Sequence, residues 1–594
     1  MHLVTNAFTY LGSYEMNISV EALRKRILAA KGEIEADLVL RGARVVNVFT
    51  GEIREKEVAI ADGIIVGLGT DYQGKEESDL RGKWLVPGFI DGHIHIESSM
   101  LAPKELGAAL LVQGTTAIVS DPHEIANVLG LEGIRFMLRE SSGIPFDIFF
   151  MAPSCVPATD LETAGADLGP SDLSELKDEP RILGLAEMMN FPGLLMGNKA
   201  VLEKIALFED QILDGHCPLL SGQELQAYLS TGIRSDHETS NRAEGLEKVE
   251  GGMMLMIREG TSAKNLEELL PLINSRNSRR FCFVSDDLHA EDIEKRGHLN
   301  FTLKKAVQLG LDPVTAIQLV TLNPAEYFGL KDRGAIAPGY RADLVVLDNL
   351  EDFKVYAVYK EGQQVADNGM LVNYPLRQNK VQLAPPEPLN MAPLTPESFR
   401  IPYQGTRAKV IELIPGQIIT RIRHEEVRSD GPWVVSDLES DILKLCVAER
   451  HKATGRIGLA LVKGFGLKRG AIASSVAHDS HNVIAVGVTD HEIFRAVDEI
   501  RIMGGGLSVV CGDDVLAKTP LEIGGLMSAQ PLEGLVKQLK VVKAAASSLD
   551  CDLEEPFMAL SFLALPVVPE LRLTDKGLVD VSRFQIVPLF ATTH

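Results

Sequence analysis

The sequence predicts an α/β fold: a (β/α)8 TIM-like barrel with a small composite β-domain and a C-terminal α/β domain. Three observations support this prediction. Eight short apolar segments alternate with helix-length stretches, similar β-hairpin patterns flank that region on both sides, and a proline-rich stretch precedes a further α/β region. Alternating β and α units favour a parallel sheet, and eight of them favour a closed barrel.

The composition is that of a globular chain. Its 594 residues exceed one ordinary core and allow roughly three to five domain-sized units. Apolar residues make up 45% and charged residues 24%, proportions that exclude a disordered chain. No apolar run approaches the ~20 residues of a membrane helix, and the N-terminus lacks the basic region of a signal peptide. We therefore expect a cytoplasmic protein without a membrane partner.

The formal charge of −23 argues against a nucleic-acid partner, which would require a basic stripe on the surface. It leaves the binding of a single free base or nucleoside open. Six cysteines are scattered without a CxxC pair. That pattern fits reduced thiols and excludes a cysteine-type zinc site by spacing.

Residues 1–83 are expected to hold a helix and the first part of the small β-domain. The helix is predicted over 20–31, where apolar residues share one face. Two strand-like runs, at 36–48 and 58–67, are punctuated by glycines and favour β-hairpins. Similar sequence recurs after the central region, so residues 331–380 are expected to supply the second part of the same domain.

The barrel is expected over residues 84–330. Its strand candidates are short and apolar, and each is separated from the next by room for one helix. They lie at 84–92, 115–120, 146–152, 181–187, 210–216, 231–236, 252–258 and 280–286. In this fold the chemistry sits at the C-terminal ends of the strands.

A proline-rich linker is expected at 381–400, followed by the C-terminal domain at 401–594. Strands of that domain are predicted near 409–414, 457–463, 482–488 and 507–511. Its densest polar cluster contains His478, Asp479, His481 and Asn482. A surface turn or an interface loop is expected there, with a second metal site as the alternative. Our hypothesis is that this loop closes over the barrel mouth.

Two histidines, His93 and His95, follow the first predicted strand. Alternate residues of a strand face the same way, so both imidazoles point to one side. Histidine is the commonest protein ligand of catalytic metals, and its neutral form suits Zn, Fe or Mn. The pair therefore predicts half of a metal site.

Other strand ends bring further ligands to the same rim of the barrel. Imidazoles or carboxylates end six of the eight predicted strands: His93 and His95; Asp121, His123 and Glu124; Glu187; His216; Asp236, His237 and Glu238; and Asp286 and Asp287. Strand three offers only Ser154 and Cys155, and strand seven offers Arg258 and Glu259. The predicted metal ligands are His93, His95, Glu187, His216, His237 and Asp286.

This ligand set exceeds the needs of one catalytic zinc, for which three ligands and a water suffice. With Glu187 bridging, it fits two ions about 3.5–4 Å apart, which lower the pKa of a water between them. Asp286 or Asp287 can take the proton of that water and pass it to a leaving nitrogen. The predicted reaction is hydrolysis at a C–N centre, with Asp286, Glu187 and His123 as catalytic residues.

The stretches Pro87-Gly-Phe-Ile-Asp-Gly-His93-Ile-His95, Leu322-Asn-Pro-Ala325 and Gly339-Tyr-Arg-Ala-Asp343 resemble the amidohydrolase superfamily, over about residues 36–375. Within it, the chain is similar to the adenine deaminase family over nearly its whole length. That similarity is carried by the stretches His95–Met100, Ser120–Asn127, Gly184–Asn190, Val476–Asn482 and Gly504–Val510.

The resemblance implies a metal-dependent hydrolase that deaminates free adenine to hypoxanthine and ammonia with two Mn²⁺ or Fe²⁺ ions, Zn²⁺ being an alternative. Binuclear relatives such as dihydroorotase and hydantoinase carry a carboxylated lysine where this chain has Glu187, which counts against a cyclic-amide hydrolase. Another amidohydrolase acting on a cyclic amide or N-acyl group stays open, and a non-catalytic scaffold ranks last. We expect a homo-oligomer, dimeric or larger.

Four residues are predicted to contact the substrate: Ser98, Asp121, Asp287 and His478. Ser98 can equally cap a helix, and local hydrogen bonding is the favoured interpretation of Asp121. His123 can orient a ligand or the leaving group, or it can cap the helix that follows it. The superfamily pattern favours Asp286 over Asp287 as the proton carrier.

Overall fold

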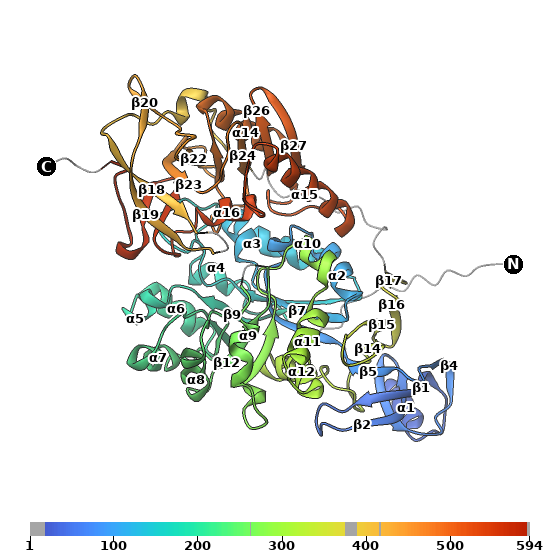
Figure 1. Ribbon diagram of the computed structural model, residues 1–594. Coiled ribbons are helices and arrows are strands. Elements are labelled where there is room, and N and C mark those ends of the chain that lie inside the picture. Colours follow the sequence, from blue (N-terminus) through green and yellow to red (C-terminus); the bar gives the residue numbers. More distant parts are fainter. Residues whose placement is uncertain (1–17, 262, 375–388, 415–416, 591–594) are drawn as a thin grey trace.

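The structure is a computed structural model that describes residues 18–261, 263–374, 389–414 and 417–590. Figure 1 shows the C-terminal domain, in orange and red, lying against the barrel, in cyan and green. The predicted linker at 381–400 falls partly outside the described residues, and its described part contains a short 3-10 helix at Pro396–Phe399. Among the described helices, none combines the length and the apolar character needed to cross a membrane.

The small β-domain is one sheet assembled from both flanks of the barrel. Its strands follow the order β17-β16-β15-β14-β5-β1-β2-β3, with β4 paired to β1. Helix α1 (Val20–Ala30) packs on it and begins at Ser19, whose hydroxyl accepts the amide of Ala22. The strands are β1 (Ala36–Val46), β2 (Ile53–Ala61), β3 (Ile64–Gly69), β4 (Gly74–Asp79), β5 (Trp84–Pro87), β14 (Leu344–Leu347), β15 (Val355–Lys360), β16 (Gln363–Asp367) and β17 (Met370–Leu371).

The strand predicted at 84–92 is in fact two strands. β5 pairs with β1 and β14 in the small β-domain, whereas β6 (Phe89–Ile94) opens the barrel. The break falls at Pro87 and Gly88, because proline lacks the amide hydrogen that a continuing ladder needs. Gly88 also passes so close to Thr116 that a Cβ atom there would lie 2.2 Å from the threonine hydroxyl. The first barrel strand therefore begins at Phe89 rather than at residue 84.

The barrel strands are parallel, which confirms the predicted fold class. One sheet runs β10-β9-β8-β7-β6 and another runs β11-β12-β13. A bridge between Ile94 and Asp286 joins β6 to β13. The remaining strands are β7 (Thr115–Ser120), β8 (Asp147–Ala152), β9 (Ile182–Met188), β10 (Ile212–Gly215), β11 (Ser235–Asp236), β12 (Met254–Arg258) and β13 (Phe281–Val284).

Helices of the barrel region follow its strands along the chain and surround the sheet (Figure 1). They are α2 (Pro103–Leu111), α3 (His123–Glu140), α4 (Pro170–Ser174), α5 (Phe191–Leu195), α6 (Lys199–Leu207), α7 (Gly222–Leu229), α8 (Arg242–Glu250), α9 (Leu266–Leu269), α10 (Ala290–Arg296), α11 (Leu299–Gln308), α12 (Pro313–Leu319) and α13 (Leu322–Tyr327). The arrangement sends the C-terminal ends of β6 to β13 to one rim, as a parallel barrel requires.

The C-terminal domain centres on a sheet of order β19-β18-β23-β22-β25-β24-β26-β27. Its helices are α14 (Asp490–Met503), α15 (Leu532–Ser547) and α16 (Pro556–Phe562). Its strands are β18 (Arg407–Leu413), β19 (Thr420–Glu426), β20 (Arg428–Asp430), β21 (Trp433–Val435), β22 (Ile442–Ala448), β23 (Ile457–Lys463), β24 (Ala471–Ser474), β25 (Val483–Gly487), β26 (Gly506–Cys511), β27 (Asp514–Pro520), β28 (Leu571–Thr574), β29 (Gly577–Asp580) and β30 (Gln585–Ile586).

Backbone and side-chain contacts hold the C-terminal domain against the barrel. The amide of Ser528 donates to the carbonyl of Met100, and the carbonyl of Ser528 accepts the amide of Ala102. The carboxylate of Asp575 accepts the amide of Thr163 at 2.8 Å and its hydroxyl at 2.7 Å. These contacts fix the loop at residues 477–482 beside the ends of the first barrel strands.

A buried ion-pair network fastens β8 to the small β-domain. Asp147 pairs with Arg333 and with Lys360 Nζ at 2.5 Å, and Lys360 also pairs with Asp343. Burial alone would raise the pKa of Asp147, but the two cations hold it below its ordinary range. The charge on Asp147 therefore contributes stability that is complete above the unfolded pKa of about 4 and is lost as the pH falls through the lower folded pKa.

We expect Asp147→Asn to lower the free energy of unfolding by about 3 kcal/mol at neutral pH, because the two cations lose a buried partner. Urea unfolding followed by circular dichroism measures this change. The difference from the wild type should begin to shrink below pH ~4, where the Asp147 carboxylate of the unfolded chain takes up a proton while that of the folded protein stays ionised. Asp210→Asn removes an exposed acid paired with Lys177 and should leave the unfolding midpoint unchanged. Equal effects of both variants would contradict the assigned role.

Candidate metal centre

Closure of the barrel brings Asp286 to the two histidines of the first strand. The amide of Asp286 donates to the carbonyl of His93 at 2.9 Å, and its carbonyl accepts the amide of His95 at 3.3 Å. Asp286 has a φ of 59°, a left-handed conformation that aspartate adopts more readily than most residues. Its Oδ1 consequently lies 3.4 Å from His93 Nε2 and 3.2 Å from His95 Nε2.

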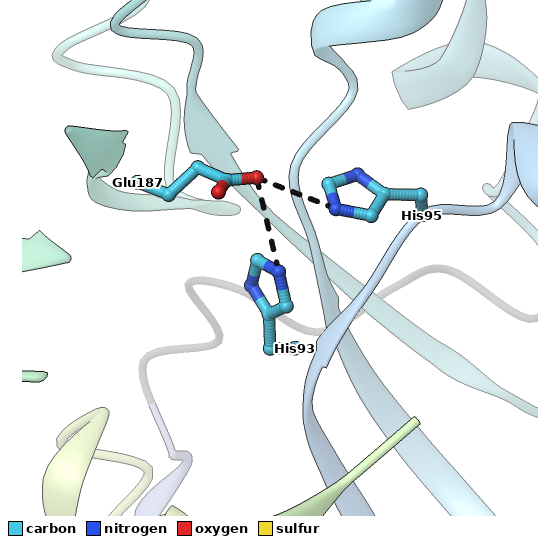
Figure 2. A group of neighbouring side chains, drawn as sticks. All are labelled: His93, His95 and Glu187. Atoms are coloured by element: carbon cyan, nitrogen blue, oxygen red, sulfur yellow. Dashed lines mark ion pairs between the residues drawn. The ribbon is translucent and has the colours of Figure 1, made fainter. Parts of the chain in front are cut away.

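Glu187, near the C-terminal end of β9, lies between two pairs of histidines. Its Oε1 is 3.4 Å from His95 Nε2 and 3.9 Å from His93 Nε2, the two contacts drawn in Figure 2. Its Oε2 is 2.6 Å from His216 Nδ1 and 3.1 Å from His237 Nε2. Each oxygen of one carboxylate thus faces a different histidine pair, as in a carboxylate that bridges two ions.

The surroundings of both carboxylates of the centre favour their ionised form. Burial alone would raise the pKa of Glu187 and of Asp286. The imidazoles around each group outweigh that effect, with Arg258 adding to it at Asp286, and lower both pKa values well below the ordinary range. Ionised carboxylates and neutral imidazoles are the forms that bind metal.

The donor set fits divalent metal ions. His93 Nε2 is buried and has no hydrogen-bond partner among the described residues, although buried polar atoms are normally paired. Imidazole and carboxylate donors together suit Mn, Fe and Zn. Ligand atoms lie within 4.8 Å of one another in three groups: His93, His95 and Glu187; His93, His237 and Asp286; and Glu187, His216 and His237.

Asp121 contacts the Nδ1 atoms of two of the imidazoles. Its backbone carbonyl lies 3.1 Å from His95 Nδ1, a contact that in the neutral ring would hold the hydrogen on Nδ1 and leave Nε2 as the ligand atom. Its carboxylate lies 3.0 Å from His123 Nδ1, and that nitrogen is 3.7 Å from Glu187 Oε1. The structure thus places His123 beside the centre, and it shows Asp121 in local contacts with both His95 and His123.

Two residues that the sequence left unassigned also lie in the centre. Arg258, the last residue of β12, donates to Asp286 Oδ2 at 2.9 Å and pairs with both oxygens of Glu238. Glu238 Oε1 is 3.6 Å from His237 Nε2. Their position at strand ends was visible in the sequence, but nothing in the local pattern shows that they pair across neighbouring strands.

The other predicted residues gather around Glu124, the second residue of α3. Ser98 Oγ lies 2.5 Å from Asp287 Oδ1 and 3.2 Å from Glu124 Oε1. His478 Nδ1 lies 3.5 Å from Glu124 Oε1, and its ring stacks on Phe562 with centroids 4.8 Å apart. Glu124, which the sequence did not assign to the site, therefore connects the barrel rim to the C-terminal domain.

Two family models match the chain: the amidohydrolase family over residues 84–365 and the adenine deaminase C-terminal domain over residues 417–585. An adenine deaminase of Desulfatibacillum aliphaticivorans is 48% identical over 569 residues, which cover 95% of this chain and 99% of the relative. Adenine deaminase 2 of Carboxydothermus hydrogenoformans is 47% identical over 576 residues, covering 96% and 100%. An adenine deaminase of Methanothrix thermoacetophila is 47% identical over 570 residues, covering 95% and 99%.

Proposed function

The chain belongs to the adenine deaminase family of the amidohydrolases, and from that premise we propose that it hydrolyses free adenine to hypoxanthine and ammonia. The observation that carries the chemistry is Glu187, whose two oxygens face separate histidine pairs. Hydrolysis of a cyclic amide or N-acyl group is less well supported, because the relatives are named adenine deaminases along nearly the full chain. A non-catalytic scaffold is disfavoured because every predicted ligand position is filled.

Membership of the amidohydrolase family implies a divalent metal centre. We propose that His93, His95 and Asp286 would hold one ion and that His216 and His237 would hold a second, with Glu187 facing both histidine sets. Mn²⁺ or Fe²⁺ are the ions proposed, and Zn²⁺ is the alternative that the same donors accept. When bound, such a pair lowers the pKa of water and supplies a nucleophile at neutral pH.

The side chains of the centre provide the proton transfers of the reaction. Arg258 donates a hydrogen bond to Asp286 Oδ2, and Asp286 Oδ1 is directed at the centre. Asp286 accepts one proton of the attacking water as its oxygen adds to C6 of adenine, and it returns that proton to the amino nitrogen as the C6–N6 bond breaks. The second proton of the water ends on ring nitrogen N1 of hypoxanthine. We propose that His123 orients the departing amino group, and the contact between its Nδ1 and Asp121 holds its ring.

A direct assay tests the proposal. Protein loaded with Mn²⁺ or with Fe²⁺ under reducing conditions should convert adenine to hypoxanthine with release of one ammonia per base, followed by the change in ultraviolet absorbance. Dihydroorotate, a hydantoin and an N-acyl amino acid are assayed separately as alternative substrates. Turnover of any of these with none of adenine would replace the proposal with the amidohydrolase alternative.

Arg258→Leu should lower kcat/KM for adenine by about 10–100-fold, the usual cost of removing a group that orients a metal ligand. Asp286 and Glu238 would each lose a charged partner, so the position of Asp286 Oδ1 would become less defined. Arg280→Leu is the matched control. Arg280 precedes the N-terminal end of β13, the end away from the centre, so its loss should leave kcat/KM unchanged. Full activity of Arg258→Leu would show that Asp286 needs no such support.

A further inference from the structure

Buried polar atoms without partners gather where the loop at 477–482 meets the barrel. Within the described residues they include Glu124 Oε2, Asp479 Oδ2 and His481 Nε2. Glu124 is 1% exposed and His481 0% exposed, so bulk water does not satisfy them. Buried polar atoms in native proteins are nearly always paired. The cluster therefore calls for a polar ligand.

His481 offers a hydrogen-bond donor to that ligand. The amide of Ala477 donates to its Nδ1 at 3.1 Å, so the hydrogen of the neutral ring sits on Nε2. Burial, together with nearby cationic groups, lowers the pKa of His481 well below its ordinary value, which favours the neutral ring. A protonated Nε2 cannot ligate a cation. A metal ion bound by Glu124, His478 and His481 is therefore disfavoured, although their ligand atoms lie within 4.8 Å of one another.

Glu124 offers the matching acceptor. Its Oε2 lies 3.7 Å from His481 Nε2, which is too long for a direct hydrogen bond. The other oxygen, Oε1, is already within reach of Ser98 at 3.2 Å. Glu124 Oε2 and His481 Nε2 thus form a neighbouring acceptor and donor, which we call the reading pair.

The reading pair adjoins the metal centre. Glu124 shares one group of ligand atoms with His95 and His123 and a second group with His478 and His481. A purine with C6 at the centre presents its opposite edge away from the metal ligands. In adenine that edge carries N3, an acceptor lying across the six-membered ring from C6, and N9–H, a donor. The two atoms match the donor and the acceptor of the reading pair.

We propose that the reading pair recognises the N3 and N9–H edge of adenine and selects the free base over N9-substituted purines. This inference rests on the proposed function. His481 Nε2–H donates to N3, and Glu124 Oε2 accepts from N9–H. A substituent at N9 removes that donor and adds bulk against two fully buried side chains, so nucleosides are rejected.

The test compares adenine with 3-deazaadenine, which has a C–H in place of N3, in the metal-loaded wild type and in His481→Phe. The wild type should prefer adenine by roughly 10–100-fold in kcat/KM. His481→Phe should reduce that preference by about tenfold relative to the wild type, because the donor for N3 is gone. Comparing the two ratios cancels the intrinsic reactivity of each substrate.

A matched control is His451→Phe. His451 Nε2 lies 2.7 Å from the carbonyl of Ser480, so this variant loosens the same loop without removing the donor. It should lower kcat/KM for both substrates by one common factor. If His481→Phe does not fold, Glu124→Met with adenine and 9-methyladenine supplies the equivalent comparison for N9–H.

The outcomes separate this inference from the proposed function. A wild type that releases no ammonia from adenine contradicts the proposed function itself. A wild type that deaminates adenine but shows the same preference as His481→Phe, or equal rates with 3-deazaadenine, overturns only the reading pair. If the preference for adenine over 3-deazaadenine also disappears in His451→Phe, the position of the loop determines selectivity, and the reading-pair proposal is overturned.

Discussion

Asp286→Asn is expected to lower kcat for adenine by about 10²–10⁴-fold, the range supplied by a positioned general base. The asparagine amide keeps the size of the side chain but cannot take the proton of the attacking water. It also weakens one side of the metal centre, where Asp286 Oδ1 lies 3.2 Å from His95 Nε2. Ammonia release under saturating adenine measures the effect, and circular dichroism verifies the fold.

Asp287→Asn is the matched comparison, because the two acids are adjacent in the sequence but differ in their contacts. Asp287 Oδ1 lies 2.5 Å from the hydroxyl of Ser98, on the Glu124 side of the site. Its variant should lose less than about tenfold in kcat, as expected for one hydrogen bond near the substrate. If kcat falls further in Asp287→Asn than in Asp286→Asn, Asp287 rather than Asp286 is the general base.

Much of the barrel could be predicted because buried parallel strands have a strong local signal. The strand expected at 115–120 coincides with β7, since every residue of it is buried. The prediction of a single strand at 84–92 was wrong, because Pro87 and Gly88 lie inside one apolar run. Only the partner strands show that the chain passes from one sheet to another there. Edge strands such as β19, Thr420–Glu426, carry mostly exposed polar residues and resemble surface loops in sequence.

The residues of the metal centre could be predicted in part for a similar reason. Strand ends in a parallel barrel meet at one rim, so His93 and Glu187 are brought together by topology alone. Contacts between side chains on different elements depend on docking instead. Arg258 pairs with Glu238, and His481 approaches Glu124. In neither case does the sequence around one residue indicate the other as its partner.

Glu187→Gln is expected to abolish the proposed two-metal centre. The variant keeps the shape of the side chain, but the charge that both histidine pairs face is lost. Bound metal, measured by equilibrium dialysis and mass spectrometry, should fall from two ions per chain to one or none. Turnover of adenine should fall by at least about 1,000-fold, because the nucleophile depends on both ions.

Glu238→Gln provides the control for Glu187→Gln, since it removes a neighbouring negative charge from the same rim. Glu238 Oε1 lies 3.6 Å from His237 Nε2, yet its oxygens are already paired with Arg258. Because its charge is neutralised by that cation, its loss should leave two ions bound. If Glu187→Gln still bound two ions while Glu238→Gln bound one, the bridging carboxylate would be Glu238. Identical metal content in both variants and the wild type would instead mean that the histidines and Asp286 hold the ions without a bridge.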